Sequence, residues 1–435
     1  MQLAHEDNLI QAAAGMNIVR VGVYSALATV ARLLFSLAIV KIIAWQSGPE
    51  GVGKLGQFLS LMSIVAAFAG GGIASGVIKY VAEYKNSIRE RNQLLQTATA
   101  FTVLCAITSA ILLVLSSSWL ATWLLGDAKY RWLIVLLAFA QLLIAGHNLI
   151  MAVLSGLMEA RSVAVIHITG AVAGVTIALA LAYLYGNNGT LYALVIGQAL
   201  LLGISYPLFR RNVGFESSAY RPRLDRRIFG LLGRYSLMAL TSALLAPLAQ
   251  IAVRNHLVAE FSWHDAGCWQ AVVKLSDAYL LAITMAISMY YLPKLSATLD
   301  RRGLIAEIRT AFSFFLPVAI LAAAAIYTFR EELIVLLFSD KFLSASDLFA
   351  PQLLSDLLKV ASLMLSYVMI AKAMTKLFIA SEMAFTFTYV VWVWALTAQY
   401  GPLGAMYASV VNYVTYLLFN AIIVRRYLLS LTPST

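Results

Sequence analysis

The sequence has 435 residues, of which 61% are hydrophobic and only 12% are charged, and its mean hydropathy is +0.84. Soluble globular domains have about 45–50% apolar and about 25% charged residues, so the composition excludes a soluble protein and indicates many membrane crossings. The formal net charge is +11. Because the basic loops lack the interleaved aromatic residues of a nucleic-acid groove, nucleic acid is not an expected partner.

Windows of roughly 20 mostly apolar residues, the length that crosses a bilayer, predict twelve transmembrane helices. They are 21–43, 55–81, 96–116, 132–154, 162–185, 190–209, 235–253, 267–292, 310–328, 353–371, 377–396 and 403–424. Residues 1–17 have neither the basic start nor the cleavage site of a signal peptide, so we expect them to stay attached as an N-terminal extension.

The lysines and arginines predict the orientation of these helices. With the N-terminus in the cytoplasm, twenty of the 31 basic residues fall in inner stretches and six in outer ones, which is the positive-inside pattern. Both termini are therefore expected in the cytoplasm. The predicted organisation is a cytoplasmic extension 1–17, an N-terminal bundle 18–209, a basic cytoplasmic linker 210–234, a C-terminal bundle 235–424 and a cytoplasmic tail 425–435.

An internal repeat relates the two bundles. "YGNNGTLYALVI" at 185–196 matches "YGPLGAMYASVV" at 400–411 at an offset of 215 residues, and "LLGD" at 124–127 matches "LFSD" at 337–340. Two halves of equal orientation imply a pseudo-two-fold axis along the membrane normal, and transporters of this kind bind substrate between the halves. The predicted fold class is an all-α integral membrane protein with two pseudo-symmetric six-helix bundles.

Two glycine-rich stretches need a separate interpretation. "GPEGVGKL" at 48–55 resembles a nucleotide-binding loop but has Leu55 in place of the hydroxyl that binds Mg²⁺, so we interpret it as a turn. "GGGIASG" at 70–76 has small residues that let helices pack closely, or else it breaks its helix. Neither the two cysteines nor the five histidines have metal-ligand spacing, so no metal and no cofactor are expected.

Polar side chains form stripes on several predicted helices. An ionisable group in hydrocarbon is costly, so it persists where it has a partner or faces water. On the span 267–292, Gln270, Lys274 and Asp277 are spaced for one helical face. The stripes on other spans contain Arg32, Asp356, Lys359, Glu382, Tyr389, Asn412 and Tyr416.

Two interpretations of these stripes stay open at this point. Stripes from both halves predict one central aqueous cavity. Alternatively, Lys274–Asp277 and Asp356–Lys359 are ion pairs at i,i+3 that only tie helices together. Arg32 has no acidic residue within one helical turn, so the second interpretation does not account for it.

Several phrases resemble a known family. They are "GPEGVGKLGQF", "GVIKYVAEYK", "WQAVVKLSDAYL", "YYLPKLSATLD", "LLFSDKF" and "LFAPQLLSDLLKV". They resemble the Wzx-type flippases of lipid-linked polysaccharide units, particularly the branch for enterobacterial common antigen and related O-antigens, in the multidrug, oligosaccharidyl-lipid and polysaccharide exporter superfamily. The resemblance implies a central cationic cavity between two six-helix bundles. It also implies movement of an undecaprenyl-pyrophosphate-linked oligosaccharide from the cytoplasmic to the periplasmic leaflet of the bacterial inner membrane by alternating access.

The residue types fit such a carrier. Fixed cations bind phosphates, and the candidates for this role are Arg32, Lys274 and Lys359. Amides and aromatic hydroxyls suit sugars, and the candidates are Gln270, Asn412, Tyr416 and Tyr389. Carboxylates that release the cations or take up a coupling proton are Asp277, Asp356 and Glu382. Coupling to an ion gradient or to the membrane potential is expected. The expected partners are the lipid-linked oligosaccharide, membrane lipids, the glycan polymerase and its chain-length machinery.

Two other classes of function remain as alternatives. A multidrug or cation antiporter of the same superfamily would favour an acidic cavity, whereas the predicted spans contain five basic residues and three acidic ones. A membrane glycan polymerase or ligase would need a large outer loop with clustered polar residues. The predicted outer loops are short, so the sequence predicts a transporter and not an enzyme.

Overall fold

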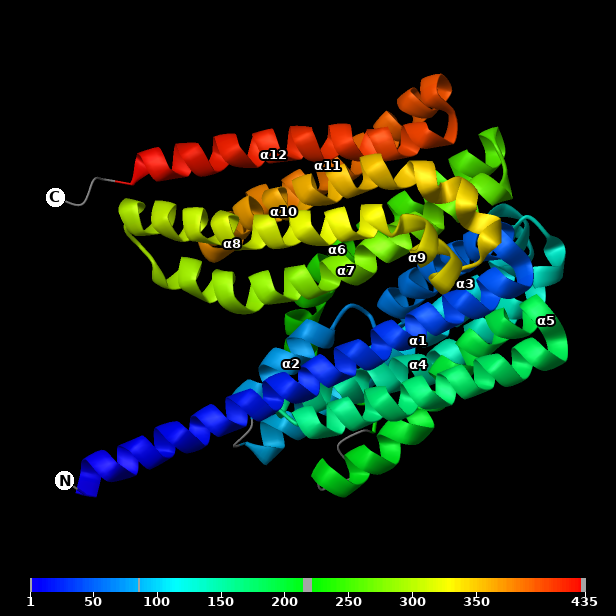
Figure 1. The fold of residues 1–435 in the computed structure, drawn as a ribbon. Coiled ribbons are helices and arrows are strands. Elements are labelled where there is room, and N and C mark those ends of the chain that lie inside the picture. The colour runs from blue at the N-terminus through cyan, green and yellow to red at the C-terminus, as the bar shows by residue number, and fades with distance from the viewer. Residues whose placement is uncertain (1, 85–86, 214–220, 432–435) are drawn as a thin grey trace. The chain divides into compact units, whose positions relative to one another are not determined.

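The computed structural model describes residues 2–84, 87–213 and 221–431. Within these ranges the regular elements are helices and no strand occurs; Figure 1 labels most of them. The α-helices are α1 (Gln2–Ala69), α2 (Ala74–Glu83), α3 (Ile88–Leu125), α4 (Arg131–Gly156), α5 (Ala160–Val213), α6 (Arg226–Glu260), α7 (Trp263–Ala297), α8 (Arg301–Thr328), α9 (Arg330–Leu337), α10 (Phe349–Ala371), α11 (Thr375–Tyr400) and α12 (Gly404–Ser430). Short 3-10 helices are η1 (Ala128–Tyr130), η3 (Asp340–Leu348) and η4 (Gly401–Leu403).

The helices of the described ranges are those of a multi-pass membrane protein. Nine stretches in these ranges are long and apolar enough to cross a membrane. The stretch Thr29–Ala69 is divided by the kink at Gly48, and the stretch Thr375–Ser430 contains both α11 and α12. The expected all-α membrane fold is confirmed, whereas the number of twelve crossings stays a prediction.

The chain forms two compact units. The N-terminal unit comprises Met1–Ile42 and Phe58–Leu244, and the C-terminal unit comprises Ile43–Gln57 and Leu245–Thr435. Segment 43–57 therefore packs in the C-terminal unit, although in sequence it lies inside the predicted bundle 18–209. Part of the predicted linker 210–234 lies outside the described residues, and the predicted domain boundaries stay predictions.

Glycines explain why segment 43–57 packs so closely against α7. A Cβ atom on Gly267 would overlap the backbone of Pro49, and one on Gly53 would lie 3.3 Å from the carbonyl oxygen of Trp263. Only a residue without a side chain lets two backbones approach this closely. The hydropathy of the sequence does not reveal this contact.

Three sharp turns within long helical stretches have the same backbone conformation. Gly48, Gly186 and Gly401 have φ angles of 60°, 61° and 61° with ψ angles of −154°, −145° and −152°. Positive φ is readily adopted by glycine and strained for other residues. Each of the three glycines is followed three residues later by a second glycine, in "GPEG", "GNNG" and "GPLG". The predicted turn in the stretch 48–55 is thus confirmed at Gly48, and the residues that follow are helical.

The second glycine of two of these turns is required by packing. A Cβ atom on Gly189 would overlap the carbonyl oxygen of Leu181, and one on Gly404 would overlap that of Leu396. In both turns the glycine contacts the residue eight positions earlier. Since the two turns are related by the offset of 215 residues, the repeat found in the sequence is also a repeat of local geometry.

A second pair of turns repeats at the same offset. Met158 and Ala373 are the non-glycine residues with positive φ in the described part of the chain, at 61° and 55°. The following amides, those of Glu159 and Met374, donate to carbonyl oxygens five residues earlier at 2.9 and 2.8 Å. These hydrogen bonds satisfy carbonyls at the ends of α4 and α10. In neither turn is the residue with positive φ a glycine.

The predicted helix 55–81 is interrupted. Gly71 and Gly72 have φ angles of 62° and 64°, and α2 starts afresh at Ala74. A Cβ atom on Gly71 would lie 2.5 Å from the ring of Phe101, and one on Gly72 would lie 2.8 Å from the carbonyl oxygen of Ser236. Of the two interpretations of the stretch 70–76, a break in the helix is confirmed, and the single span 55–81 is wrong, because these glycines both turn the chain and admit close neighbours.

Each unit has its own apolar core. In the N-terminal unit, α2, α3 and α5 meet around Val77, Leu94 and Ile166, and in the C-terminal unit α7 and α10 meet around Ile287 and Met364. Because lipid tails are as apolar as these side chains, close van der Waals packing and not removal from water stabilises the two cores. In the C-terminal unit α10 is in contact with α7, α8, α11 and α12, so a polar side chain on α10 faces several neighbours at once.

Candidate functional site

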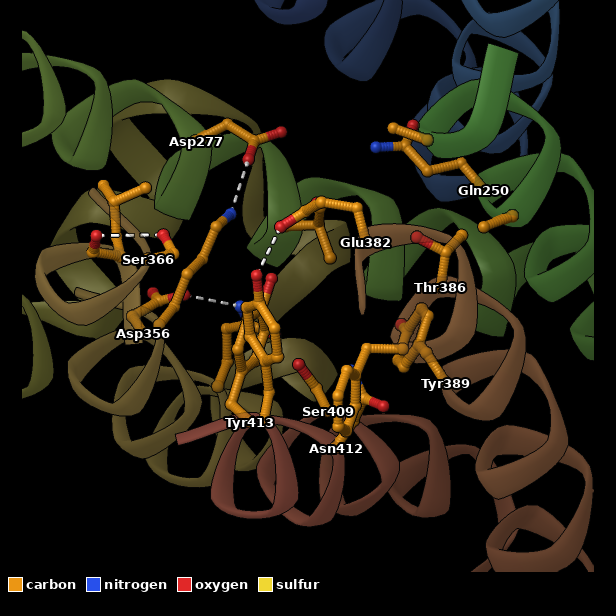
Figure 2. A pocket seen from close by; sticks show the side chains of 18 of the residues that line it. Gln250, Asp277, Asp356, Ser366, Glu382, Thr386, Tyr389, Ser409, Asn412 and Tyr413 are labelled. Carbon is orange, nitrogen blue, oxygen red and sulfur yellow. Dashed lines mark hydrogen bonds and ion pairs between the residues drawn. The ribbon is translucent and has the colours of Figure 1, made fainter. Parts of the chain in front are cut away.

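A pocket of about 310 Å³ lies within the C-terminal unit, between α6, α7, α10, α11 and α12 (Figure 2). It is lined by Ala246, Ala249, Gln250, Trp269, Val273, Asp277, Gln352, Asp356, Lys359, Leu363, Ser366, Glu382, Phe385, Thr386, Tyr389, Ser409, Asn412, Tyr413 and Tyr416. Pockets that bind small molecules combine aromatic walls with a few polar groups and have volumes of about 300–1,000 Å³. This pocket has that character and lies at the small end of the range.

An ion pair between two helices crosses the pocket. Lys359 on α10 places its Nζ 3.8 Å from Oδ1 of Asp277 on α7, as the dashed line in Figure 2 shows. The side chains are 38% and 49% exposed. In the described part of the chain no ion pair joins Lys274 to Asp277. The hypothesis of ion pairs within single helices is therefore wrong for Asp277, whose partner comes from another helix.

Asp356 accepts hydrogen bonds from neutral side chains of α7 and α10. It is only 1% exposed. The hydroxyl of Tyr279 donates to its Oδ2 at 2.8 Å, and Nε2 of Gln352 donates to its Oδ1 at 2.9 Å. Hydrogen bonds to a charged group contribute about 1.5–3 kcal/mol, so this carboxylate ties α7 to α10.

Glu382 reaches the pocket from α11. The hydroxyl of Tyr416 on α12 donates to its Oε1 at 2.5 Å. The ring of Tyr416 also packs against Phe385, with centroids 4.7 Å apart. Nearby, Thr388 donates to Oδ1 of Asn412 at 3.0 Å. These contacts fix the orientation of polar groups that the sequence could place only on helix faces.

The structure gathers seven of the ten predicted site residues around this one pocket. They are Asp277, Asp356, Lys359, Glu382, Tyr389, Asn412 and Tyr416. Lys274 is half-buried on α7 and is not among the lining residues. The side chain of Arg32 on α1 lies outside the described residues, so its predicted role stays a prediction.

The predicted stripe on α7 divides into two adjacent rows. Trp269, Val273 and Asp277 follow a spacing of four residues and line the pocket, whereas Gln270 and Lys274 belong to the neighbouring row. The helical period alone groups all of these positions on one broad face. Only the packing of α7 separates the residues that line the pocket from those beside it.

The sequence did not predict that Arg254 is buried. The predicted span ended at 253, but α6 continues to Glu260 and Arg254 is fully buried. Its Nε donates to Oε1 of Gln57 at 3.0 Å, and its Nη1 donates to Oε1 of Gln270. Its guanidinium also lies 5.9 Å from the ring of Trp269. Gln270 thus binds Arg254 in this structure, and its predicted sugar-facing role stays a prediction.

Trp269 and Tyr413 were also missed. Trp269 lines the pocket, but in a hydropathy window its ring looks like any other apolar residue of a transmembrane helix. Tyr413 lies three residues before Tyr416, a residue of the predicted stripe on α12. The same helical spacing could have included it in the stripe.

Similarity to known sequences now identifies the family. A model of the polysaccharide biosynthesis protein family matches residues 48–347. The chain belongs to this family. It is 33% identical to the lipid III flippases of Escherichia coli (strain K12) and Shigella flexneri over 403 residues, which cover 92% of this chain and 96% of each relative. The resemblance to flippases of lipid-linked polysaccharide units is therefore confirmed.

Solved structures share the fold. A multidrug resistance transporter of the MATE family in an inward-facing conformation superposes with a TM-score of 0.77 at 13% identity, covering 91% of this chain and 95% of that one. A lipid II flippase in an inward closed conformation superposes with a TM-score of 0.72 at 14% identity, covering 96% of this chain and 94% of that one. These identities show the fold alone. They agree with the predicted transporter architecture.

Proposed function

We propose that the protein is a flippase for an undecaprenyl-pyrophosphate-linked oligosaccharide, an O-antigen or enterobacterial common antigen repeat unit. The observation that carries this proposal is the 33% identity to lipid III flippases over 92% of the chain. The aligned region covers nearly the whole of both proteins. The protein catalyses no covalent reaction and moves its substrate from the cytoplasmic to the periplasmic leaflet by alternating access.

The chemistry of the substrate explains the intramembrane charges. A pyrophosphate with several sugars cannot cross roughly 30 Å of hydrocarbon unaided. Fixed cations bind the phosphates, and the candidates for this role are Arg32, Lys274 and Lys359. Lys274 is favoured among them because it is half-buried in a span and forms no ion pair with any described residue.

The ion pair of the pocket provides a route for coupling. Lys359 and Asp277 neutralise each other at 3.8 Å. When an anionic group of the substrate attracts Lys359, Asp277 loses its counter-charge and takes up a proton or another cation. Asp356 and Glu382 are the other candidates for this role. Substrate movement is thereby linked to an ion gradient or to the membrane potential.

A second candidate function is export of a cationic compound. The pocket contains three carboxylates and one lysine, a balance that also suits a cation, and the MATE-family transporter shares the fold. The flippase function is preferred because the sequence identity to that transporter is only 13%, whereas the identity to the lipid III flippases is 33%. A transport assay separates the two functions.

We further propose that the protein lies in the bacterial inner membrane with both termini in the cytoplasm. The distribution of basic residues supports this orientation. The substrate delivered to the outer leaflet then becomes available to the glycan polymerase and its chain-length machinery, which are the proposed partners together with membrane lipids.

The decisive experiment is a flipping assay in proteoliposomes. The full chain is reconstituted with the lipid-linked oligosaccharide extracted from cells that lack this flippase, with and without a pH gradient or a membrane potential. We expect the glycolipid to reach the outer leaflet only when the protein is present. Export of cationic dyes without movement of the glycolipid would instead establish the second candidate.

A further inference from the structure

The charge of the pocket in the C-terminal unit does not suit pyrophosphate. Among the lining residues that the structure describes, Asp277, Asp356 and Glu382 are acidic and Lys359 is the one lysine. That lysine is already paired with Asp277. Charges of the same sign repel strongly in a partly desolvated site, so a pyrophosphate inside this pocket would face two further carboxylates without a cation to offset them.

The walls of the pocket suit sugar rings instead. Phe385, Tyr389 and Tyr413 are half-buried and present aromatic surface from α11 and α12, whereas Trp269 of α7 lines the pocket but is only 2% exposed. A sugar ring has apolar C–H faces that can pack on aromatic rings, and hydroxyl or amide groups around its edge. Aromatic walls with a few fixed polar groups are the usual design of a small-molecule site.

The carboxylates add acceptors for the edge of a sugar. Each ionised carboxylate has about four acceptor positions. Asp356 is only 1% exposed and accepts from Tyr279 and Gln352, so it is not available to a ligand. On Glu382, which is partly exposed, the described contacts use one position, from Tyr416. Acceptor positions thus remain for hydroxyl or amide N–H donors of a ligand. Such charge-assisted hydrogen bonds are stronger than those between neutral groups.

The size of the pocket limits what can enter. Its volume is about 310 Å³, near the lower bound of roughly 300 Å³ for small-molecule sites. A polyprenyl chain with its pyrophosphate and a complete oligosaccharide is far larger. The pocket can therefore hold only part of such a substrate.

We infer that this pocket is a subsite for the sugar residues of the lipid-linked oligosaccharide, and that the pyrophosphate binds outside it. The inference rests on the proposed function and divides the substrate into two parts. Lys274, which does not line the pocket, remains available for phosphate. Lys359 then serves as the counter-ion of Asp277 at the sugar subsite and not as a primary phosphate ligand.

Ligand protection of a cysteine tests where each part of the substrate binds. Thr386→Cys places a thiol in the pocket, in a full-length chain whose Cys105 and Cys268 are replaced by serine and whose flipping activity is verified. The two probes are the lipid-linked oligosaccharide extracted from cells lacking the flippase, and undecaprenyl pyrophosphate without sugar. At ten times its dissociation constant a probe occupies about nine-tenths of the sites, so the glycolipid should slow maleimide labelling roughly tenfold.

The sugar-free lipid should leave the labelling rate unchanged at saturating concentration. Equal protection by both lipids would place phosphate in the pocket and overturn the inference. The inference would also be overturned if the glycolipid gave no protection in a preparation that flips it. If the unsubstituted protein does not flip the glycolipid at all, the proposed function fails instead, which keeps the two failures distinguishable.

Substitution of Glu382 tests the same inference by the sign of its effect. Glu382→Gln removes a negative charge and keeps the shape of the side chain. At a sugar subsite the loss of a charged acceptor should weaken glycolipid binding about tenfold and leave undecaprenyl pyrophosphate binding unchanged. At a phosphate site the same substitution should strengthen binding of both lipids, and that result would overturn the inference.

Discussion

Lys359 Nζ on α10 lies 3.8 Å from Asp277 Oδ1 on α7, in a pocket where both side chains remain partly exposed. Partly solvated ion pairs contribute about 0–1 kcal/mol to stability. A pair of this kind can open without unfolding the unit, which suits a contact that changes during transport. It also makes the pair accessible to mutational tests.

The first prediction separates a transport role of this pair from a purely structural one. Lys359→Ala, Asp277→Ala and the double mutant should all accumulate in the membrane, because each loses at most about 1 kcal/mol. All three should be defective in flipping if the pair takes part in transport. Flipping rates and membrane abundance are measured side by side. Normal flipping by the double mutant would show that the pair is only a strut between α7 and α10.

The second prediction concerns Lys274. Lys274→Ala should abolish flipping while the protein still inserts, because a fixed positive charge for phosphate is lost. Lys274→Arg should retain part of the activity, since the charge survives although its shape and donor geometry differ. Lys294→Ala is the matched control on the same helix. Lys294 forms a partly exposed ion pair with Glu307, so its replacement should leave flipping unchanged. Full activity of Lys274→Ala would refute the phosphate assignment.

The third prediction separates the structural and transport roles of Asp356. Asp356→Ala leaves the donors of Tyr279 and Gln352 without their acceptor, and it should destabilise the protein by about 1–3 kcal/mol. Asp356→Asn keeps one acceptor oxygen, so this variant should be more stable than Asp356→Ala. Thermal unfolding in detergent measures the difference. If Asp356 couples transport to protons, the Asn variant should fold well and yet lose the effect of a pH gradient on flipping. An unchanged response to the gradient would exclude Asp356 as the coupling group.

The fourth prediction tests the repeated glycine turns. Gly189→Ala and Gly404→Ala each place a Cβ atom into the carbonyl oxygen of Leu181 or Leu396, so both variants should accumulate poorly in the membrane. Gly203→Ala is the control, because a Cβ atom there meets no atom within 4 Å. Because alanine favours a helix more than glycine does, Gly203→Ala should stabilise the protein by about 0.5–1 kcal/mol. Normal abundance of both turn variants would contradict the packing argument.

The fifth prediction concerns orientation. Cysteines at Tyr185 and Tyr400, which are 69% and 54% exposed, should react with an impermeant maleimide in intact spheroplasts. A cysteine at Arg223, an exposed position of the predicted linker, should react only after the inner membrane is permeabilised. Each variant needs the background without Cys105 and Cys268. The reverse pattern would overturn the orientation inferred from the basic residues.

By itself the sequence determined the class of protein, the repeat and the four charged residues of the described pocket lining. Composition requires a membrane because so apolar a chain cannot be covered by polar surface. The repeat offset of 215 residues follows from matched letters, and the turns at Gly186 and Gly401 bear it out in backbone angles. Charged side chains in apolar spans are conspicuous because they are costly there.

Only the tertiary structure decided which side chains meet. Helical spacing suggested Lys274 as the neighbour of Asp277, whereas packing of α10 against α7 brings Lys359 to it. The extension of α6 buries Arg254, and the positive φ angles of Gly71 and Gly72 divide a predicted helix. Periodicity reports the face of one helix. Contact between helices depends on long-range packing and on backbone angles, for which a single sequence has no local signal.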